Sequence, residues 1–358
     1  MSTATEALPV TPAASGAFPA FEPHPWIPGG HAQTIVGRYL FRTRLHLPST
    51  PHEIDVGGGD RLLVLDAIPE RWAPGGPAAV LVHGLSGCAR SPYVVRLAIR
   101  LAEQGIRTVQ VNLRNAGEGF GIARGIYHSG RTEDLRPIGR WLAARAEGSP
   151  VAWIGFSLGA NLVLKLAAEA PDHPPDGLDC VLAANPPLDL HASCRQIQLP
   201  ANRLYDQNFI RLLRADVAKL HARFPELGPV DLSGVASLYD FDEAYTAPRN
   251  GFQNADHYYR ECSAGPLLER IAVPGLVIHA EDDPFIPAEA FRNASFPPRL
   301  ALELIPSGGH LGYVSRSKLG RDRRWLEARL AAWLAQHWGL PQGDAPARPR
   351  DGGPKSHA

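Results

Sequence analysis

Short apolar runs alternate with amphipathic segments along most of the chain. The runs that read as strands are continuous in apolar residues: 61–69, 78–84, 106–114, 151–157, 178–186, 275–283 and 300–308. Such runs are typical of a parallel sheet that is covered on both faces. Segments with helical spacing lie between or after them: 91–104, 132–147, 158–170 and 322–338. The alternation predicts an α/β fold with a mostly parallel, doubly wound sheet.

One long interval, from about 187 to 268, interrupts this alternation. Inside it, residues 206–224 have helical spacing, with these apolar residues on one face: Leu213, Val217, Leu220 and Phe224. We interpret the interval as a helical cap over the carboxyl edge of the sheet, where α/β proteins place their sites. A basic amphipathic helix could instead contact a membrane or an acidic partner, and the sequence leaves that alternative open.

The two ends of the chain differ in composition from the rest. Residues 1–20 are rich in Ala, Thr, Pro and Ser, and 341–358 lack large apolar residues that would anchor them. We therefore predict disordered segments at both ends of one domain that spans 21–340.

Composition limits the function classes. The chain has 358 residues, 44% of them hydrophobic, with 36 basic and 36 acidic side chains. This balance gives no support for nucleic-acid binding. The four cysteines are widely spaced, which argues against a disulfide scaffold or a structural zinc site and suits a reducing compartment. Residues 1–20 show no secretory signal. Nowhere in the chain is an apolar stretch long enough to span a membrane. We therefore expect a cytoplasmic protein.

The segment 151–170 changes character at Ser157. The residues before this serine predict a buried strand, and those after it predict a helix. The motif Gly155-Phe156-Ser157-Leu158-Gly159 lies at the junction. Gly-x-Ser-x-Gly carries weight only in a strand–turn–helix context, which is present here. The turn would raise Ser157 above the sheet and direct the helix N-terminus at the reacting oxygen.

A serine nucleophile needs a base, and the base needs a carboxylate that orients it. Downstream of Ser157, Asp283 and then His310 follow the ends of two predicted strands, on the edge where the serine should emerge. The chain order of serine, acid and histidine is the one that this fold class uses. Because neighbouring residues at a strand end point in opposite directions, only one of Asp282 and Asp283 can face the histidine.

An oxyanion hole would complete the site with two backbone N–H groups. One is expected from Leu158, directly after the serine. The other is expected from Leu85, where Gly84 permits a close backbone approach.

Seven motifs together resemble one family. They are HGLSGCARSPYV, VNLRNAGEGFG, YHSGRTEDL, GFSLGANLVLKL, FDEAYTAPRNGF, DHYYRECSA and HAEDDPFIP…GGHLGYV. In this order they are similar to the YheT-like branch of the α/β-hydrolase superfamily, and the resemblance covers about 24–338.

The resemblance implies an α/β-hydrolase fold and a serine hydrolase that cleaves carboxylic esters of acyl groups through Ser157, Asp283 and His310. It selects Asp283 over Asp282 as the acid because Asp283 directly precedes PFIP. It implies no cofactor. Separately, the histidines His24, His31, His128 and His191 lack metal-ligand spacing, so no metal site is expected.

Two other functions stay open at this point. An acyltransferase would use the same three residues and pass the acyl group to an alcohol or thiol. A binding protein on this scaffold would hold a lipid-like ligand without turnover. We expect a monomer acting on a small acyl ester, with an apolar pocket formed by cap aromatics: Phe209, Tyr239, Phe241, Tyr245, Phe252, Tyr258 and Tyr259.

Overall fold

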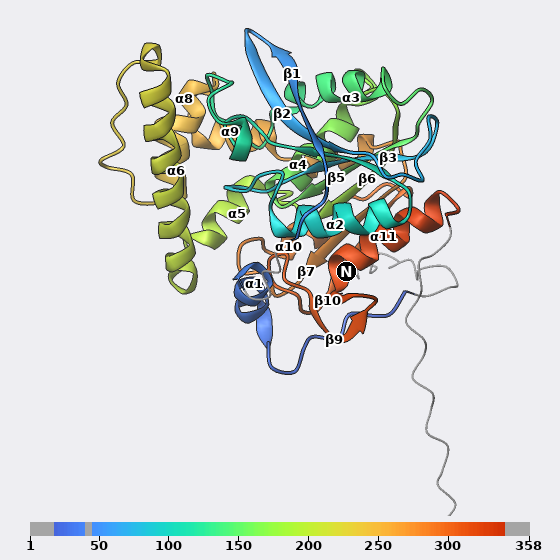
Figure 1. The fold of residues 1–358 in the computed structure, drawn as a ribbon. Helices are drawn as coiled ribbons and strands as arrows, with labels where there is room; N and C mark the ends of the chain where they lie inside the picture. Colours follow the sequence, from blue (N-terminus) through green and yellow to red (C-terminus); the bar gives the residue numbers. More distant parts are fainter. Residues whose placement is uncertain (1–17, 40–44, 341–358) are drawn as a thin grey trace, which may run out of the picture.

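The computed structural model describes residues 18–39 and 45–340, which are built around one eight-stranded sheet (Figure 1). Its strands are β1 (Thr50–Gly57), β2 (Asp60–Ala67), β3 (Ala78–Val82), β4 (Arg107–Val111), β5 (Val151–Phe156), β6 (Leu178–Ala184), β7 (Gly275–Ala280) and β8 (Leu300–Ile305). They lie in the order β1-β2-β4-β3-β5-β6-β7-β8. β1 and β2 pair antiparallel, and all pairs from β4 to β8 are parallel. The predicted doubly wound α/β sheet is confirmed.

Helices surround this sheet, and a small ribbon follows its last strand. The helices are α1 (Gly29–Tyr39), α2 (Pro92–Glu103), α3 (Arg136–Ala143), α4 (Leu158–Glu169), α5 (Leu190–Ile197), α6 (Arg203–Arg223), α7 (Leu238–Phe241), α8 (Ala247–Arg249), α9 (Ala255–Cys262), α10 (Glu289–Arg292) and α11 (Trp325–His337). The ribbon pairs β9 (Val314–Leu319) with β10 (Asp322–Arg324).

The observed boundaries of several strands and of one helix differ from the predicted ones. The predicted strands run too far at their carboxyl ends: the run 78–84 is a strand only over Ala78–Val82, and its last residues form a loop. The predicted helix 322–338 begins as strand β10 and becomes helical at Trp325. Strand β1 was missed because it lies at the sheet edge and buries only Ile54.

Two helical layers cover the sheet, one on each face. Neighbouring side chains on a strand pack against different layers. On β5, Trp153 faces the layer of α3 and α4, whereas Ile154 faces the layer of α2 and α11. Both side chains are fully buried. Because burying one large apolar side chain stabilises the fold by about 1.5–3 kcal/mol, a strand buried on both sides favours apolar residues at every position.

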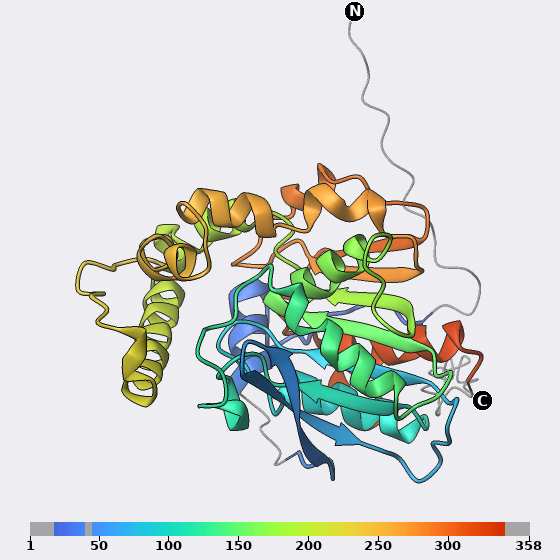
Figure 2. The same ribbon diagram turned by 90° about the horizontal axis from the view of Figure 1, so that it is seen from above.

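The segment between β6 and β7 contains α5 to α9, and its long helix α6 stands beside the sheet in both views (Figures 1 and 2). Leu213, Val217 and Leu220 of α6 are buried as predicted, and Phe224 is half-buried. Between α7 and α8 the chain makes a π-helical turn, Asp242–Thr246. The domain limits 21–340, with a cap at about 187–268, stay a prediction.

Arg214 of α6 has hydrogen-bond partners within the chain. The Arg214 guanidinium donates hydrogen bonds to the carbonyls of Leu232 and Val235, the latter at 2.7 Å. Across residues 18–39 and 45–340, no helix has both the length and the apolar character needed to cross a bilayer. The disordered ends predicted at 1–20 and 341–358 lie almost entirely outside the described residues.

Candidate active site

Ser157 occupies a tight left-handed turn between β5 and α4. Its φ and ψ are 54° and −122°, a conformation that costs a non-glycine residue roughly 1–3 kcal/mol. Glycines make the turn possible: a Cβ on Gly155 would lie 2.1 Å from the Gly159 carbonyl oxygen, and one on Gly159 would lie 2.4 Å from the His83 carbonyl oxygen. The sequence reading of this strand–turn–helix unit is therefore correct.

Ser157, His310 and Asp283 lie in one chain of hydrogen bonds. His310 Nε2 is 2.9 Å from Ser157 Oγ, and His310 Nδ1 is 2.8 Å from Asp283 Oδ2. Because the carboxylate can only accept, we assign the proton of the neutral imidazole to Nδ1. Nε2 is then the acceptor for the serine hydroxyl. The structure thus brings together three side chains that are far apart in the sequence.

The Asp283 carboxylate is buried, and several hydrogen-bond donors contact it. Its Oδ1 accepts the Phe285 N–H at 2.8 Å and its Oδ2 accepts the Asn185 side-chain amide at 2.6 Å. Burial alone would raise the pKa of Asp283, but the positive charge of His310 and the hydrogen bonds from His310 and the Phe285 N–H outweigh it and hold this pKa below its ordinary value. Asp283 is therefore an anion at neutral pH.

Asp282 has a different function from its neighbour. Its Oδ1 accepts the N–H of Gly309 at 2.8 Å, a contact between residues 27 positions apart. No local pattern in the sequence indicates this distant partner. Asp282 ties the end of β7 to the loop that carries His310.

Two further residues that fix this loop were not found from the sequence. Asn185 directly follows β6 with φ 48°, donates to Asp283 and the Gly309 carbonyl, and accepts the Tyr313 hydroxyl at 2.9 Å. Thr34 of α1 accepts the backbone N–H of His310 at 2.8 Å. Asn185 had a visible signal, since a polar residue just after a buried strand lies on the carboxyl edge. Thr34 had none.

The backbone N–H groups of Leu85 and Leu158 differ from those of their neighbours in lacking an acceptor among the described residues. The flanking N–H groups have partners: Gly84 donates to the Tyr93 hydroxyl at 3.1 Å, and Ser86 donates to the Tyr127 hydroxyl at 2.7 Å. For Leu85 and Leu158, no acceptor exists within the part of the chain that the structure describes. Both residues line the same cavity as Ser157 and His310.

His83 holds the loop that carries Leu85. Its Nε2 accepts the Leu113 N–H at 3.2 Å, so Nδ1 carries the proton and donates to the Gly84 carbonyl at 2.7 Å. Complete burial lowers the pKa of His83 to about 4, although the bond to Gly84 opposes the shift. A neutral His83 therefore fixes the loop at neutral pH.

A cavity of about 160 Å³ opens above Ser157. Residues from the segment between β6 and β7 supply much of its apolar wall, including Leu213, Val217 and Leu220. Of the seven aromatic residues predicted to line a pocket, four do so: Phe209, Phe241, Tyr258 and Tyr259. Tyr239, Tyr245 and Phe252 pack among other residues of the same segment.

Two acidic side chains, Asp216 and Asp242, interrupt the apolar wall. Asp242, in the π-helical turn, is buried and accepts the Tyr259 hydroxyl at 2.8 Å. Burial raises the pKa of Asp242 to about 6, and hydrogen bonds from Thr246 and Tyr259 oppose the shift. Near this pH the carboxyl can accept or donate a hydrogen bond within the cavity.

Comparison with known proteins agrees with the observed fold. Residues 77–317 match the family model described as alpha/beta hydrolase fold. An Escherichia coli K12 protein named "Putative esterase YheT" is 34% identical over 86% of this chain and 90% of its own. A Saccharomyces cerevisiae monoacylglycerol lipase is 27% identical over 72% of this chain, which spans 59% of that protein. The solved Pyrococcus furiosus esterase Pf2001 has a similar fold, with a TM-score of 0.54, 16% identity, and coverage of 90% of this chain and 98% of its own.

The titration of His83 gives a prediction about acid stability. Above its ordinary pKa of 6.5 the residue is neutral in both the folded and unfolded states. As the pH falls below 6.5, the unfolded state takes up a proton that the folded state excludes until about pH 4. This should cost about 2 kcal/mol of unfolding free energy between pH 6.5 and 5.

Urea unfolding from pH 5 to 7 measures this cost, with His83→Gln as the test and the exposed His173→Gln as the control. We expect the His83 variant to lose less stability on acidification than the wild type, and the His173 variant to follow the wild type. Equal pH slopes for the His83 variant and the wild type would refute the assignment.

Proposed function

The chain belongs to the alpha/beta hydrolase fold family, and from that premise we propose that it is a serine hydrolase that cleaves carboxylic esters. The observation that supports this best is the hydrogen-bond chain from Asp283 through His310 to Ser157, with contacts of 2.8 and 2.9 Å. Such a chain activates a hydroxyl that is otherwise a poor nucleophile.

The proposed reaction begins with proton transfer from Ser157 to His310 Nε2. The serine oxygen bonds to the ester carbonyl carbon, and the carbonyl oxygen becomes an anion that accepts the N–H groups of Leu85 and Leu158. Asp283 stabilises the imidazolium. When the bond to the alcohol oxygen breaks, His310 returns the proton to that oxygen, leaving an acyl group on Ser157.

Water completes the cycle in the proposed second half. His310 takes a proton from water, and the resulting hydroxide oxygen bonds to the acyl carbon. The bond to Ser157 then breaks, and His310 returns the proton to the serine oxygen. Each N–H donor to the oxyanion is worth about 10²–10³ in kcat in comparable enzymes, so the Leu85 loop should contribute substantially to the rate.

We propose a substrate with an apolar acyl chain, held in the cavity above Ser157. The apolar wall from Leu213, Val217 and Leu220 supports this, as does the similarity to a monoacylglycerol lipase. All four cysteines are free thiols, which supports the proposal of a cytoplasmic protein. A monomer that acts without a cofactor remains part of the proposal.

The nucleophile is tested by covalent labelling. A fluorophosphonate probe should label the wild-type protein at Ser157 because the activated hydroxyl displaces fluoride from phosphorus. Ser157→Ala should abolish labelling and ester turnover while the thermal unfolding temperature is kept. Unchanged turnover in this variant, or an unlabelled but folded wild type, would contradict the proposal and favour a binding protein.

The two adjacent carboxylates should differ sharply in their effect on catalysis. In Asp283→Asn, the amide presents a donor to His310 Nδ1 and favours the wrong tautomer, so kcat should fall by roughly 10³-fold or more. Asp282→Asn keeps an oxygen that can accept the Gly309 N–H and should cost far less. Both variants are compared by kcat on p-nitrophenyl esters at matched thermal stability, and the reverse ranking would refute the assignment.

The bounded cavity should select among acyl chains. We expect kcat/KM for p-nitrophenyl esters to pass through a maximum between acetate and palmitate, because added methylenes gain contacts until the wall is reached. Separate assays of free acid and of ester formed with an added alcohol then distinguish hydrolysis from acyl transfer. Equal rates along the series would contradict a bounded acyl pocket.

A further inference from the structure

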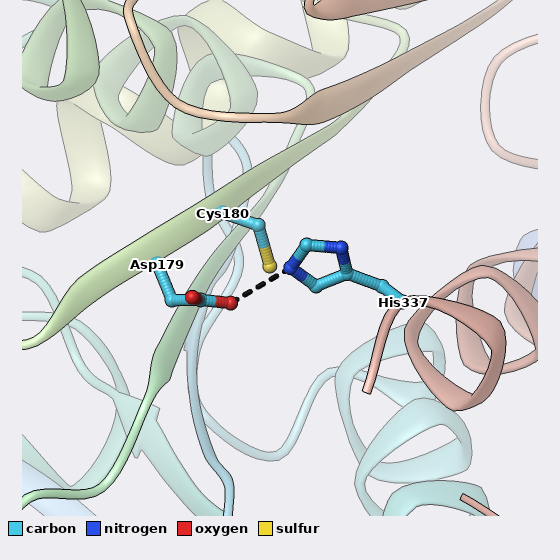
Figure 3. Close-up of side chains that lie close together, drawn as sticks. All are labelled: Asp179, Cys180 and His337. Atoms are coloured by element: carbon cyan, nitrogen blue, oxygen red, sulfur yellow. Dashed lines mark hydrogen bonds and ion pairs between the residues drawn. The ribbon is translucent and has the colours of Figure 1, made fainter. Parts of the chain in front are cut away.

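A second group of reactive side chains lies at the opposite edge of the sheet. Asp179 and Cys180 are near the start of β6, and His337 is the last residue of α11 (Figure 3). Asp179 lies near the start of β6, six residues before Asn185, which directly follows that strand; this places it roughly 20 Å from the hydrogen-bond chain of Ser157. The group is therefore separate from the proposed active site.

A β-bulge brings the two strand residues to one side. Val151 pairs with Leu178 and the next residue, Ala152, pairs with Cys180, so Asp179 is an extra residue opposite no partner. Neighbouring side chains of a regular strand point to opposite faces, and a bulge breaks this alternation. Figure 3 shows both side chains directed toward His337.

The His337 ring is held in place by packing and hydrogen bonding. It stacks on Trp333 with ring centroids 4.9 Å apart and 20° between the planes. His337 Nε2 lies 2.8 Å from Asp179 Oδ2, and the Trp338 indole N–H donates to the same oxygen at 2.8 Å. The carboxylate and the imidazole are thus already oriented toward each other.

The three ligand atoms, one each of oxygen, sulfur and nitrogen, lie within 4.8 Å of one another. Zinc bonds of about 2.0–2.3 Å in a tetrahedral site separate the ligands by about 3.3–3.8 Å. Shifts of about 1 Å would therefore bring all three atoms onto one ion. We propose that Asp179, Cys180 and His337 bind one Zn²⁺ ion, with water as the fourth ligand.

The electrostatics of the group suit a divalent cation. Burial raises the pKa of the Cys180 thiol and opposes its ionisation; the Asp179 carboxylate raises this pKa further, but its negative charge attracts a cation to the group. On binding, the thiol releases its proton to solvent and the thiolate bonds to zinc. The carbonyl groups at the end of α11 also favour a positive charge there. Asp179 and His337 are partly exposed, with side-chain accessibilities of 35% and 23%, so an ion can enter from solvent.

The consequence of binding would be a link between β6 and α11. Cys180 of β6 and His337 of α11 are 157 residues apart in the chain. An ion bound by both residues would restrain the terminal helix α11 against the sheet. Because this site is remote from Ser157, zinc should raise thermal stability and leave ester turnover unchanged.

Metal-free protein titrated first with Co²⁺ and then with Zn²⁺ tests the proposal. Co²⁺ should bind at about one equivalent and give the near-ultraviolet charge-transfer absorption of a cobalt–thiolate bond. Zn²⁺ should displace it and raise the unfolding temperature by about 2 °C or more. Cys180→Ser and His337→Gln should each abolish the absorption and weaken Zn²⁺ binding at least about 10-fold.

Cys262→Ser is the matched control, because Cys262 Sγ is also near a histidine, 3.9 Å from His128 Nδ1. It should keep the cobalt–thiolate absorption. Should Cys180→Ser fail to fold, the partly exposed His337→Gln and Asp179→Asn still test the site. The proposal is overturned if the wild type shows no thiolate absorption, or if the Cys180 and His337 variants bind Zn²⁺ as tightly as the wild type. Loss of turnover in Ser157→Ala leaves all these results unaffected.

Discussion

The left-handed backbone of Ser157 is the constraint on which the rest of the site depends. At φ 54° the chain reverses from β5 into α4 within one residue, and the strand and helix approach so closely that Gly155 and Gly159 leave no room for a Cβ. This conformation costs roughly 1–3 kcal/mol, which the buried strand and helix on either side offset through their packing. The hydroxyl is consequently fixed at the carboxyl edge of the sheet.

Everything that acts on this hydroxyl is held by contacts between distant parts of the chain. Asn185 after β6 and Asp282 after β7 both bond to Gly309, and Thr34 of α1 bonds to the backbone of His310. The histidine loop is thus fixed from three directions before any substrate binds. Preorganisation of this kind reduces the reorganisation needed when charge develops in the transition state.

The features that depend on local patterns could be predicted from the sequence. The apolar runs predicted the parallel sheet, and the Gly-x-Ser-x-Gly motif between a strand and a helix predicted the turn at Ser157. His310 and the adjacent pair Asp282 and Asp283 followed from strand ends, because the carboxyl ends of parallel strands share one edge. The family resemblance then selected Asp283. The partner of Asp282, Gly309, could not be predicted because it lies 27 residues away.

The features that the sequence did not reveal depend on tertiary packing. Thr34 acts through a helix that precedes the sheet, and no spacing connects it to His310. The group of Asp179, Cys180 and His337 exists because of a bulge in β6, which alternation of side chains cannot predict. Cysteine count and spacing argue against a structural zinc site, but they carry no information on side chains that converge only in the folded chain.

The most direct test of the account is a crystal structure of the protein after reaction with a fluorophosphonate. The account predicts phosphorus bonded to Ser157 Oγ and a phosphoryl oxygen within about 3.1 Å of the N–H nitrogens of Leu85 and Leu158. An adduct on another residue, or a phosphoryl oxygen turned away from these two groups, would contradict it.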